Sequence, residues 1–245
     1  IASETCALDH IGAKYVRDIR PGEAVMIDNQ GFRTIYQREP EGNHAACVFE
    51  HIYIARPDSV VDGRLVYTSR MEMGAQLARE HPVEADMVIG VPDSATAAAV
   101  GYSQESGIPY GEGLVKNRYV GRTFILPDQR QRDLGVRRKL NPLPDLIAGK
   151  RLIVVDDSIV RGTTSPEVVN LLRKGGASEI HLRICAPPFR HPCYFGVDLP
   201  SRKQMLAANM TVEEIRQFVG PDSLGYLSHE GLVSSVGKPR DEMCM

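Results

Sequence analysis

The sequence predicts an α/β fold in which a parallel sheet is covered by helices on both faces. Two observations lead to this prediction. Continuous aliphatic runs, such as those at 86–92, 151–155 and 179–185, are typical of strands buried on both sides. Segments with helical patterning separate these runs, and such alternation of strand and helix favours a parallel sheet.

Composition narrows the class of protein. The chain has 245 residues, 42% of them hydrophobic and 24% charged, with a formal net charge of −2, so nothing global favours nucleic acid or an anionic membrane as partner. No apolar run reaches the roughly 18 residues that span a bilayer, and no secretory signal peptide is visible. Five scattered cysteines do not resemble a disulfide framework. The cytoplasm is therefore the expected compartment.

The first elements along the chain are strands. The runs EAVMID (23–28) and FRTIYQ (32–37) flank the turn signal Asn-Gln-Gly, which predicts a hairpin. The polar stretch at 38–44 is the best linker candidate. After it, CVFEHIYIA (47–55) is predicted to form another strand.

Helix signals follow. The segment 69–80 is predicted to be a helix with Ser69 near its N-cap. An alanine-rich segment after the strand at 86–92 predicts a helix that stops at Gly107.

A third helix is expected after the strand at 151–155. Ser165 suits its N-cap, Pro166 its first helical position, and Gly175-Gly176 its end. The strand at 179–185 comes next, with Cys185 as a core residue.

Two adjacent carboxylates mark the most informative position. Asp156 and Asp157 follow the strand at 151–155, and open α/β sheets bind ligands beyond the carboxyl ends of their strands. The segment 158–164 then enters a helix N-terminus, which attracts anions, and Gly162 permits a tight turn there. This pattern predicts a ligand with a phosphate, vicinal hydroxyls and a divalent cation. The alternative is a loop that only caps the next helix.

The motif VVDDSIVRGTT (154–164) resembles the phosphoribosyl-pyrophosphate (PRPP) motif of type I phosphoribosyltransferases. The segments GVPDSATAAAVGY, KNRYVGRTFILPDQRQRDLGVRRKLNP and APPFRHPCYFGVDLP resemble the glutamine PRPP amidotransferases, and the similarity covers essentially the whole chain. The resemblance implies a type I phosphoribosyltransferase fold. It also implies a glycosyltransferase activity, in which ammonia from glutamine displaces pyrophosphate from PRPP in the first step of purine synthesis.

The resemblance also implies a domain division. SETCALDHIGAKYVRDIRPGEAVMI resembles the end of the family's glutaminase domain, an N-terminal-nucleophile hydrolase, so 1–44 is expected to be its remnant. Residues 45–245 are then the phosphoribosyltransferase domain, truncated at its C-terminus. Because the chain starts at Ile1, we expect a piece of a longer protein that lacks the glutaminase nucleophile. Cys6 is expected to be a small core residue, and the piece at most ammonia-dependent.

Site residues follow from the resemblance. Mg²⁺ is expected at Ser94, Asp156 and Asp157, although Ser94 is equally an ordinary helix N-cap from its local sequence. The expected PRPP contacts lie in two segments: Pro92, Asp93 and Ser94, then Asp156, Asp157, Ser158, Ile159, Val160, Arg161, Gly162, Thr163 and Thr164.

A basic segment at 116–141 is the second expected part of the site. It carries eight lysines and arginines and is otherwise typical of a solvated loop or a nucleic-acid patch. The resemblance implies a lid that closes over PRPP, excludes water and completes an ammonia channel. The catalytic candidates in it are Lys116, Arg118, Tyr119 and Arg122.

Three cysteines complete the expectations. The spacing of Cys47, Cys193 and Cys244 indicates no more than buried thiols. The resemblance, however, implies three ligands of a [4Fe–4S] cluster, with the fourth beyond Met245.

The resemblance further implies purine nucleotide inhibitors and a homotetramer, with no nucleic-acid or membrane partner. Two rival functions stay open. A non-catalytic PRPP-sensing regulator would be expected to carry a DNA-binding module and to lack the KNRYVGRTF segment. A nucleobase-salvage phosphoribosyltransferase would need a segment that holds a base, and no aromatic-lined one is evident.

Overall fold

The computed structural model describes residues 1–39, 45–117, 140–199 and 201–245. Its centre is a four-stranded sheet in the order β11-β10-β9-β6. All three strand pairings in this sheet are parallel, which confirms the predicted fold class. The strands are β6 (Met87–Gly90), β9 (Arg151–Asp156), β10 (Glu179–Ile184) and β11 (Ser223–Tyr226).

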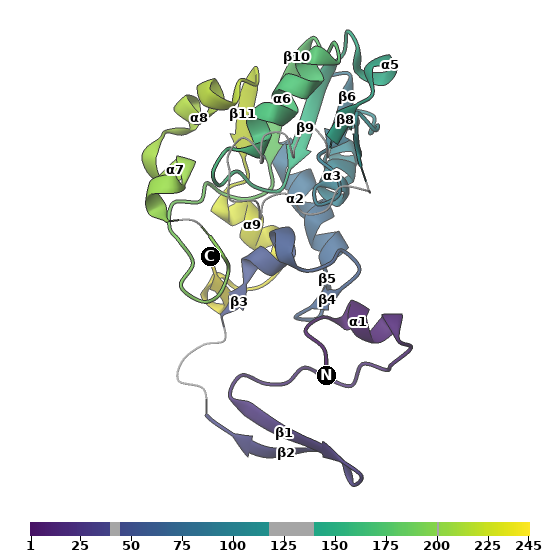
Figure 1. The fold of residues 1–245 in the computed structure, drawn as a ribbon, viewed down its shortest axis with the longest axis vertical. Coiled ribbons are helices and arrows are strands. Elements are labelled where there is room, and N and C mark those ends of the chain that lie inside the picture. The colour runs from purple at the N-terminus through teal and green to yellow at the C-terminus, as the bar shows by residue number, and fades with distance from the viewer. Residues whose placement is uncertain (40–44, 118–139, 200) are drawn as a thin grey trace.

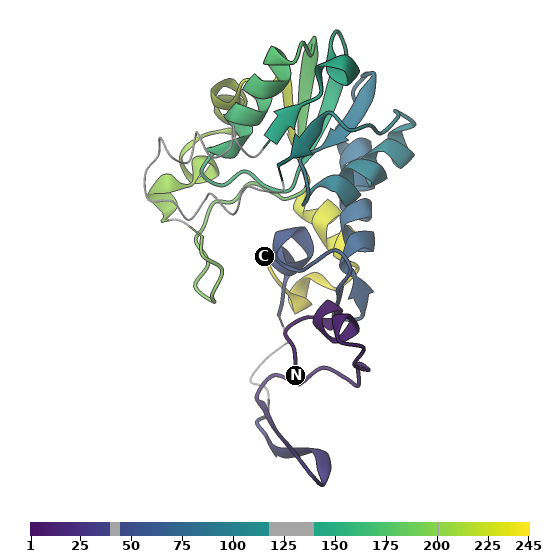
Figure 2. The ribbon, with the colours of Figure 1, turned by 45° about the vertical axis from the view of Figure 1, so that its right-hand side comes forward.

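Helices cover the sheet on both faces, as Figures 1 and 2 show. On one side α2 (Val66–Glu80) packs along α3 (Thr96–Ser106), and α9 (His229–Val236) lies against α2. On the other side α6 (Thr164–Lys174) lies beside α8 (Val212–Val219). This double cover explains the uninterrupted aliphatic runs, because residues on both faces of a central strand such as β9 are removed from water.

Short elements connect these layers. The strands pair as β3 (Ala46–Cys47) with β12 (Met243–Cys244), β4 (Val60–Val61) with β5 (Arg64–Leu65), and β7 (Leu114–Lys116) with β8 (Leu140–Pro142). Short helices elsewhere in the described residues include η1 (Glu50–Ile54), α5 (Pro144–Ile147), η2 (Arg202–Gln204), α7 (Leu206–Asn209) and η3 (Arg240–Glu242).

The predicted hairpin is confirmed. It consists of β1 (Glu23–Asp28) and β2 (Gly31–Gln37), paired antiparallel around a turn in which Asp28 Oδ1 accepts a hydrogen bond from the Gln30 amide at 2.9 Å. The hairpin lies at the end of the molecule away from the parallel sheet (Figure 1).

The preceding helix α1 (Thr5–His10) is attached to the larger part of the chain. Glu4 Oε2 accepts hydrogen bonds of 2.8 Å from the Arg56 amide and from Ser59 Oγ. Thr5 Oγ1 accepts one of 2.8 Å from the amide of Val60. Cys6 is buried in α1, as expected. Residues 1–10 therefore contact the segment before α2 directly.

The strand predicted at 47–55 is wrong beyond Cys47. After β3 the chain turns into the π-helix η1. The buried apolar residues here are Val48, Ile52 and Ala55, at a spacing of four and then three residues. That spacing places them on one helical face, and the enrichment in aromatic and β-branched residues obscured it.

Two helix starts also differ from the prediction. The helix α2 begins at Val66, so Ser69 lies inside it, fully buried, and is not near the N-cap. The helix α6 begins at Thr164, and its N-cap is Thr163 rather than Ser165. In both cases the helix begins N-terminal to the residue that the sequence predicted as its cap. The predicted end of α3 is confirmed, because Gly107 is its C-cap with φ of +72°.

None of the helices within the described residues is both long and apolar enough to cross a membrane.

Candidate functional site

The acidic pair lies at the carboxyl end of β9, in the middle of the sheet. Asp156 is 7% exposed and Asp157 8%. The Asp157 amide donates a 2.9 Å hydrogen bond to Asp156 Oδ1, and Ser158 Oγ donates one of 2.6 Å to Asp157 Oδ1. These bonds hold both carboxylates at the sheet edge where ligands of such folds bind.

Burial sets the electrostatics of the pair. It raises the pKa of Asp156 well above the ordinary value of 3.8, and the neighbouring charge of Asp157 raises it further. Burial also raises the pKa of Asp157, while Ser158, Ser94 and the charge of Arg70 act in the opposite direction. Two neighbouring carboxyls that resist ionisation form a site that is stabilised by a bound cation.

Ser94 reaches this pair from a different strand. It follows β6, and its side chain interacts with Asp157, lowering the pKa of that carboxyl. The N-cap of α3 is Ala95, so the alternative role of Ser94 as a helix cap is wrong. The structure thus gathers all three residues expected to hold the metal.

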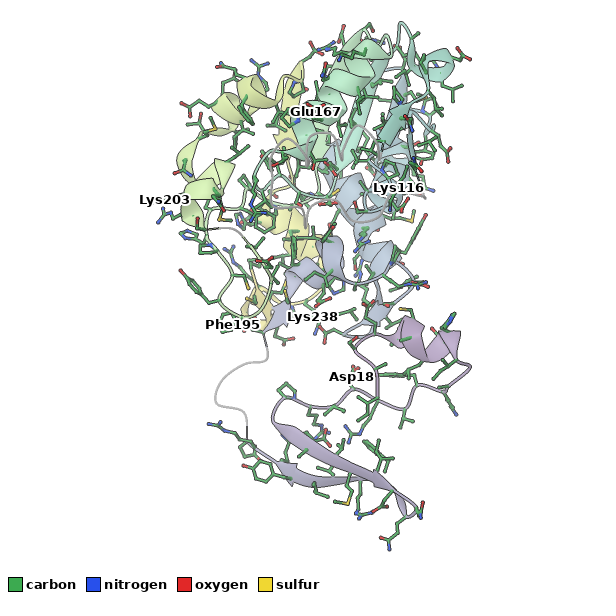
Figure 3. All side chains as sticks on the ribbon, viewed as in Figure 1. Asp18, Lys116, Glu167, Phe195, Lys203 and Lys238 are labelled. Atoms are coloured by element: carbon green, nitrogen blue, oxygen red, sulfur yellow. The ribbon has the colours of Figure 1, made fainter. Side chains whose placement is uncertain are left out.

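The turn before Ser94 is paired with a cation, the side chain of Lys116. The Pro92–Asp93 peptide bond is cis. Lys116 at the end of β7 forms a 2.5 Å ion pair with Asp93 Oδ2, and Figure 3 shows Lys116 beside this edge of the sheet. One expected catalytic residue therefore lies next to the segment expected to bind pyrophosphate.

The loop Ser158–Thr164 connects the acidic pair to α6. Ile159 is buried and anchors the loop in the core, whereas Arg161 is exposed. Gly162 has φ of +68°, a conformation that strains any other residue. The backbone amides of Thr164 and Ser165, in the first turn of α6, come soon after it, and amides at a helix N-terminus are donors suited to a phosphate.

The sequence analysis did not anticipate Arg70, whose charge acts on Asp157. It is 3% exposed on α2, and it donates hydrogen bonds of 2.8 Å to the carbonyls of His51 and Ala55. Burial lowers its pKa, and the charge of Asp157 counteracts this. A signal existed, because Arg70 stands four residues after Val66 and three before Met73, on the buried face of the helix.

Three expected lid residues, Arg118, Tyr119 and Arg122, lie outside the described residues. The lid that the resemblance implies therefore stays a prediction.

The expected cluster cysteines are only partly brought together. Cys47 and Cys244 are register partners on the paired strands β3 and β12, whereas Cys193 lies in the loop after β10. Within the described ranges no three or more histidine, cysteine or acidic side chains are grouped to hold a metal. Only two of the three thiols therefore lie next to each other, and we derive no step through a cluster. Cys185 is buried in the core, as expected.

The oxygen-rich site does fit a magnesium ion in its chemistry. It offers two carboxylates and a hydroxyl, which are the hard donors that Mg²⁺ prefers, often with substrate oxygens and water completing its shell. Carboxylates in general also accept hydrogen bonds from sugar hydroxyls. The arrangement therefore suits a phosphorylated sugar bound with a divalent cation.

Comparisons with known proteins point to one family. No family model matches the chain. It is 54% identical over 244 residues to an amidophosphoribosyltransferase of a Synechocystis species, covering 100% of this chain and 49% of that protein. It is 52% identical over 244 residues to one of Methanothermobacter thermautotrophicus, covering 100% of this chain and 51% of that protein.

A solved structure gives the same result. The glutamine PRPP amidotransferase of B. subtilis complexed with ADP and GMP superposes with a TM-score of 0.89 at 47% identity. The match covers 99% of this chain and 54% of that one. The chain thus spans about half the length of the curated relatives it matches.

Proposed function

Since the chain is homologous along its whole length to amidophosphoribosyltransferases, we propose that it binds PRPP with Mg²⁺ and replaces the pyrophosphate with ammonia, yielding 5-phosphoribosylamine. Glutamine is the proposed source of the ammonia in the whole protein. The same proposal makes 45–245 the phosphoribosyltransferase domain and 1–44 the end of a glutaminase domain.

One observation supports this proposal most: the buried Asp156–Asp157 pair is followed directly by a loop that leads to the N-terminus of α6. In this proposal the carboxylates accept hydrogen bonds from the two ribose hydroxyls. The amides of the loop and of the first helical turn bind the 5-phosphate. Together these two groups fix the sugar in one orientation.

The chemical barrier is charge separation at the sugar carbon C1. Positive charge develops at C1 while the departing pyrophosphate gains negative charge. Ser94, Asp156 and Asp157 would hold Mg²⁺, which would supply Lewis acidity toward the pyrophosphate. Lys116 adds a fixed cation on the same side, because it already pairs with Asp93.

Isothermal titration calorimetry of the chain with PRPP and Mg²⁺ tests the binding. We expect saturable heat with PRPP, and much weaker binding of ribose, which lacks both phosphate groups. Circular dichroism confirms that the titrated chain is folded. A folded chain that gives no heat with PRPP and Mg²⁺ would contradict the proposed substrate.

Turnover separates this function from its rivals. With PRPP and ammonium salt, release of pyrophosphate supports the amidotransferase reaction. Binding without pyrophosphate release indicates the regulator instead. Release that requires a purine or pyrimidine base indicates a salvage enzyme.

Lys116→Met is expected to weaken PRPP binding by roughly tenfold, because it removes one charge-assisted contact to the pyrophosphate. Lys116→Arg keeps the charge and should retain most of the affinity. Calorimetry on both variants measures this. Equal affinities of Lys116→Met and the unchanged chain would contradict a role for Lys116 at the pyrophosphate.

Nucleotide inhibition belongs to the same proposal. The B. subtilis relative is described in complex with ADP and GMP, and we propose that purine nucleotides also bind this protein and compete with PRPP. The homotetramer, the cluster and the cytoplasmic location stay predictions.

A further inference from the structure

The loop Ser158–Thr164 is contacted by residues of a later segment of the chain, which runs from η2 to α8. The Leu206 amide at the start of α7 donates a 2.9 Å hydrogen bond to the Val160 carbonyl. A Cβ placed on Gly162 would lie 2.3 Å from Leu206 Cδ1 and 3.1 Å from Phe218 Cε1. The side chain of Leu206 therefore fills the space beside the Cα atom of Gly162.

The segment that carries Leu206 is anchored independently of the loop. Met205 is fully buried, and Asn209 Nδ2 donates hydrogen bonds to the carbonyls of Met205 (2.7 Å) and Arg202 (3.0 Å). The next helix, α8, begins with a capping box between Thr211 and Glu214 and buries Ile215 completely. Because this segment is anchored, the side chain of Leu206 has a fixed position, and it limits where the loop can move.

We propose that Leu206 is a positioning residue, which presses on Gly162 and holds the loop Ser158–Thr164 in its anion-binding shape. The proposal rests on the proposed function for its ligand, and on the contacts above for its geometry. It also explains why position 162 needs glycine for two separate reasons, the φ of +68° and the space taken by Leu206.

Hydrogen exchange of the ligand-free chain tests the positioning directly. Leu206→Ala is expected to speed exchange at the amide of residue 206, which donates to the Val160 carbonyl, by about tenfold or more relative to Leu206→Met, because the bond opens more often when the packing beside the loop is lost. The amides of β6 and β10 should stay unchanged, which separates a local loosening from a general loss of stability. Leu206→Met keeps the volume and is the matched control. Unchanged exchange at this amide in Leu206→Ala overturns the proposal, whether or not PRPP is the ligand.

A double-mutant cycle tests the contact by its sign. Gly162→Ala is expected to weaken PRPP binding by about 100-fold, because its methyl group meets Leu206. In the double variant, Gly162→Ala with Leu206→Ala, the methyl group at position 162 has room. The affinity for PRPP should therefore be about tenfold higher than in Gly162→Ala alone. The remaining loss reflects the left-handed backbone of position 162.

Additive losses in the double variant overturn the proposal, because they show that the two residues act separately. If the unchanged chain fails to bind PRPP, the proposed function falls, but the exchange experiment still decides whether Leu206 positions the loop.

Discussion

Gly74→Ala is expected to lower the free energy of unfolding by more than about 4 kcal/mol, enough to unfold much of the chain at ordinary temperatures. Gly74 lies on α2 where that helix crosses α3, and a Cβ there would be 1.8 Å from the carbonyl oxygen of Ala98. The contact is reciprocal, since a Cβ on Gly101 would be 1.9 Å from the carbonyl oxygen of Met71. Because the obstacle is backbone, no side-chain rotation relieves it, and the two helices must separate.

Urea unfolding followed by circular dichroism measures this loss. Gly107→Ala is the matched control, because it lies at the end of α3 with nothing within 4 Å of the added Cβ and a φ of +72°. It should cost only about 1–2 kcal/mol for the left-handed backbone. Similar stabilities for the two variants would mean that α2 and α3 do not approach as closely as described.

Asp156→Asn is expected to weaken the binding of PRPP with Mg²⁺ by about 1000-fold. The substitution removes an anionic acceptor for a ribose hydroxyl and a ligand for the metal, and each charge-assisted interaction contributes about 1.5–3 kcal/mol. The amide keeps the shape, and its oxygen can still accept the hydrogen bond from the Asp157 backbone, which is 2.9 Å long in the native chain.

The same variant is expected to be more stable than the native chain at neutral pH. The folded protein raises the pKa of Asp156 above 3.8, so folding opposes its ionisation. Below that ordinary value the carboxyl is protonated in both the folded and the unfolded chain, and the variant gains nothing. As the pH rises above it, the native chain loses stability until the folded carboxyl ionises, so the advantage of the asparagine grows.

Thermal unfolding at several pH values and calorimetry measure the two effects on one sample. Asp145→Asn, which changes an exposed carboxylate on α5, is the control and should alter neither property. Loss of binding together with gain of stability would show that the buried charge serves the ligand at the expense of the fold. Retained PRPP affinity in Asp156→Asn would contradict the proposed site.

Much of the fold was predictable from local pattern. The hairpin followed from alternating strands around Asn29-Gln30-Gly31, and the central strands from their continuous aliphatic runs. The strand predicted at 47–55 failed for a physical reason. Segment 47–55 is rich in residues that favour strands, yet its buried positions have helical spacing. Which face of such a short segment is buried depends on its neighbours, and those are distant in the sequence.

The sequence by itself determined that two carboxylates end a buried strand and that a glycine-containing loop leads from them into a helix, because these features are contiguous along the chain. Only the tertiary structure decided that Ser94 interacts with Asp157, that the charge of Arg70 acts on Asp157, and that Leu206 rests on Gly162. Each of these interactions joins residues at least 40 positions apart, and packing of the sheet and its helices, rather than local preference, brings them together.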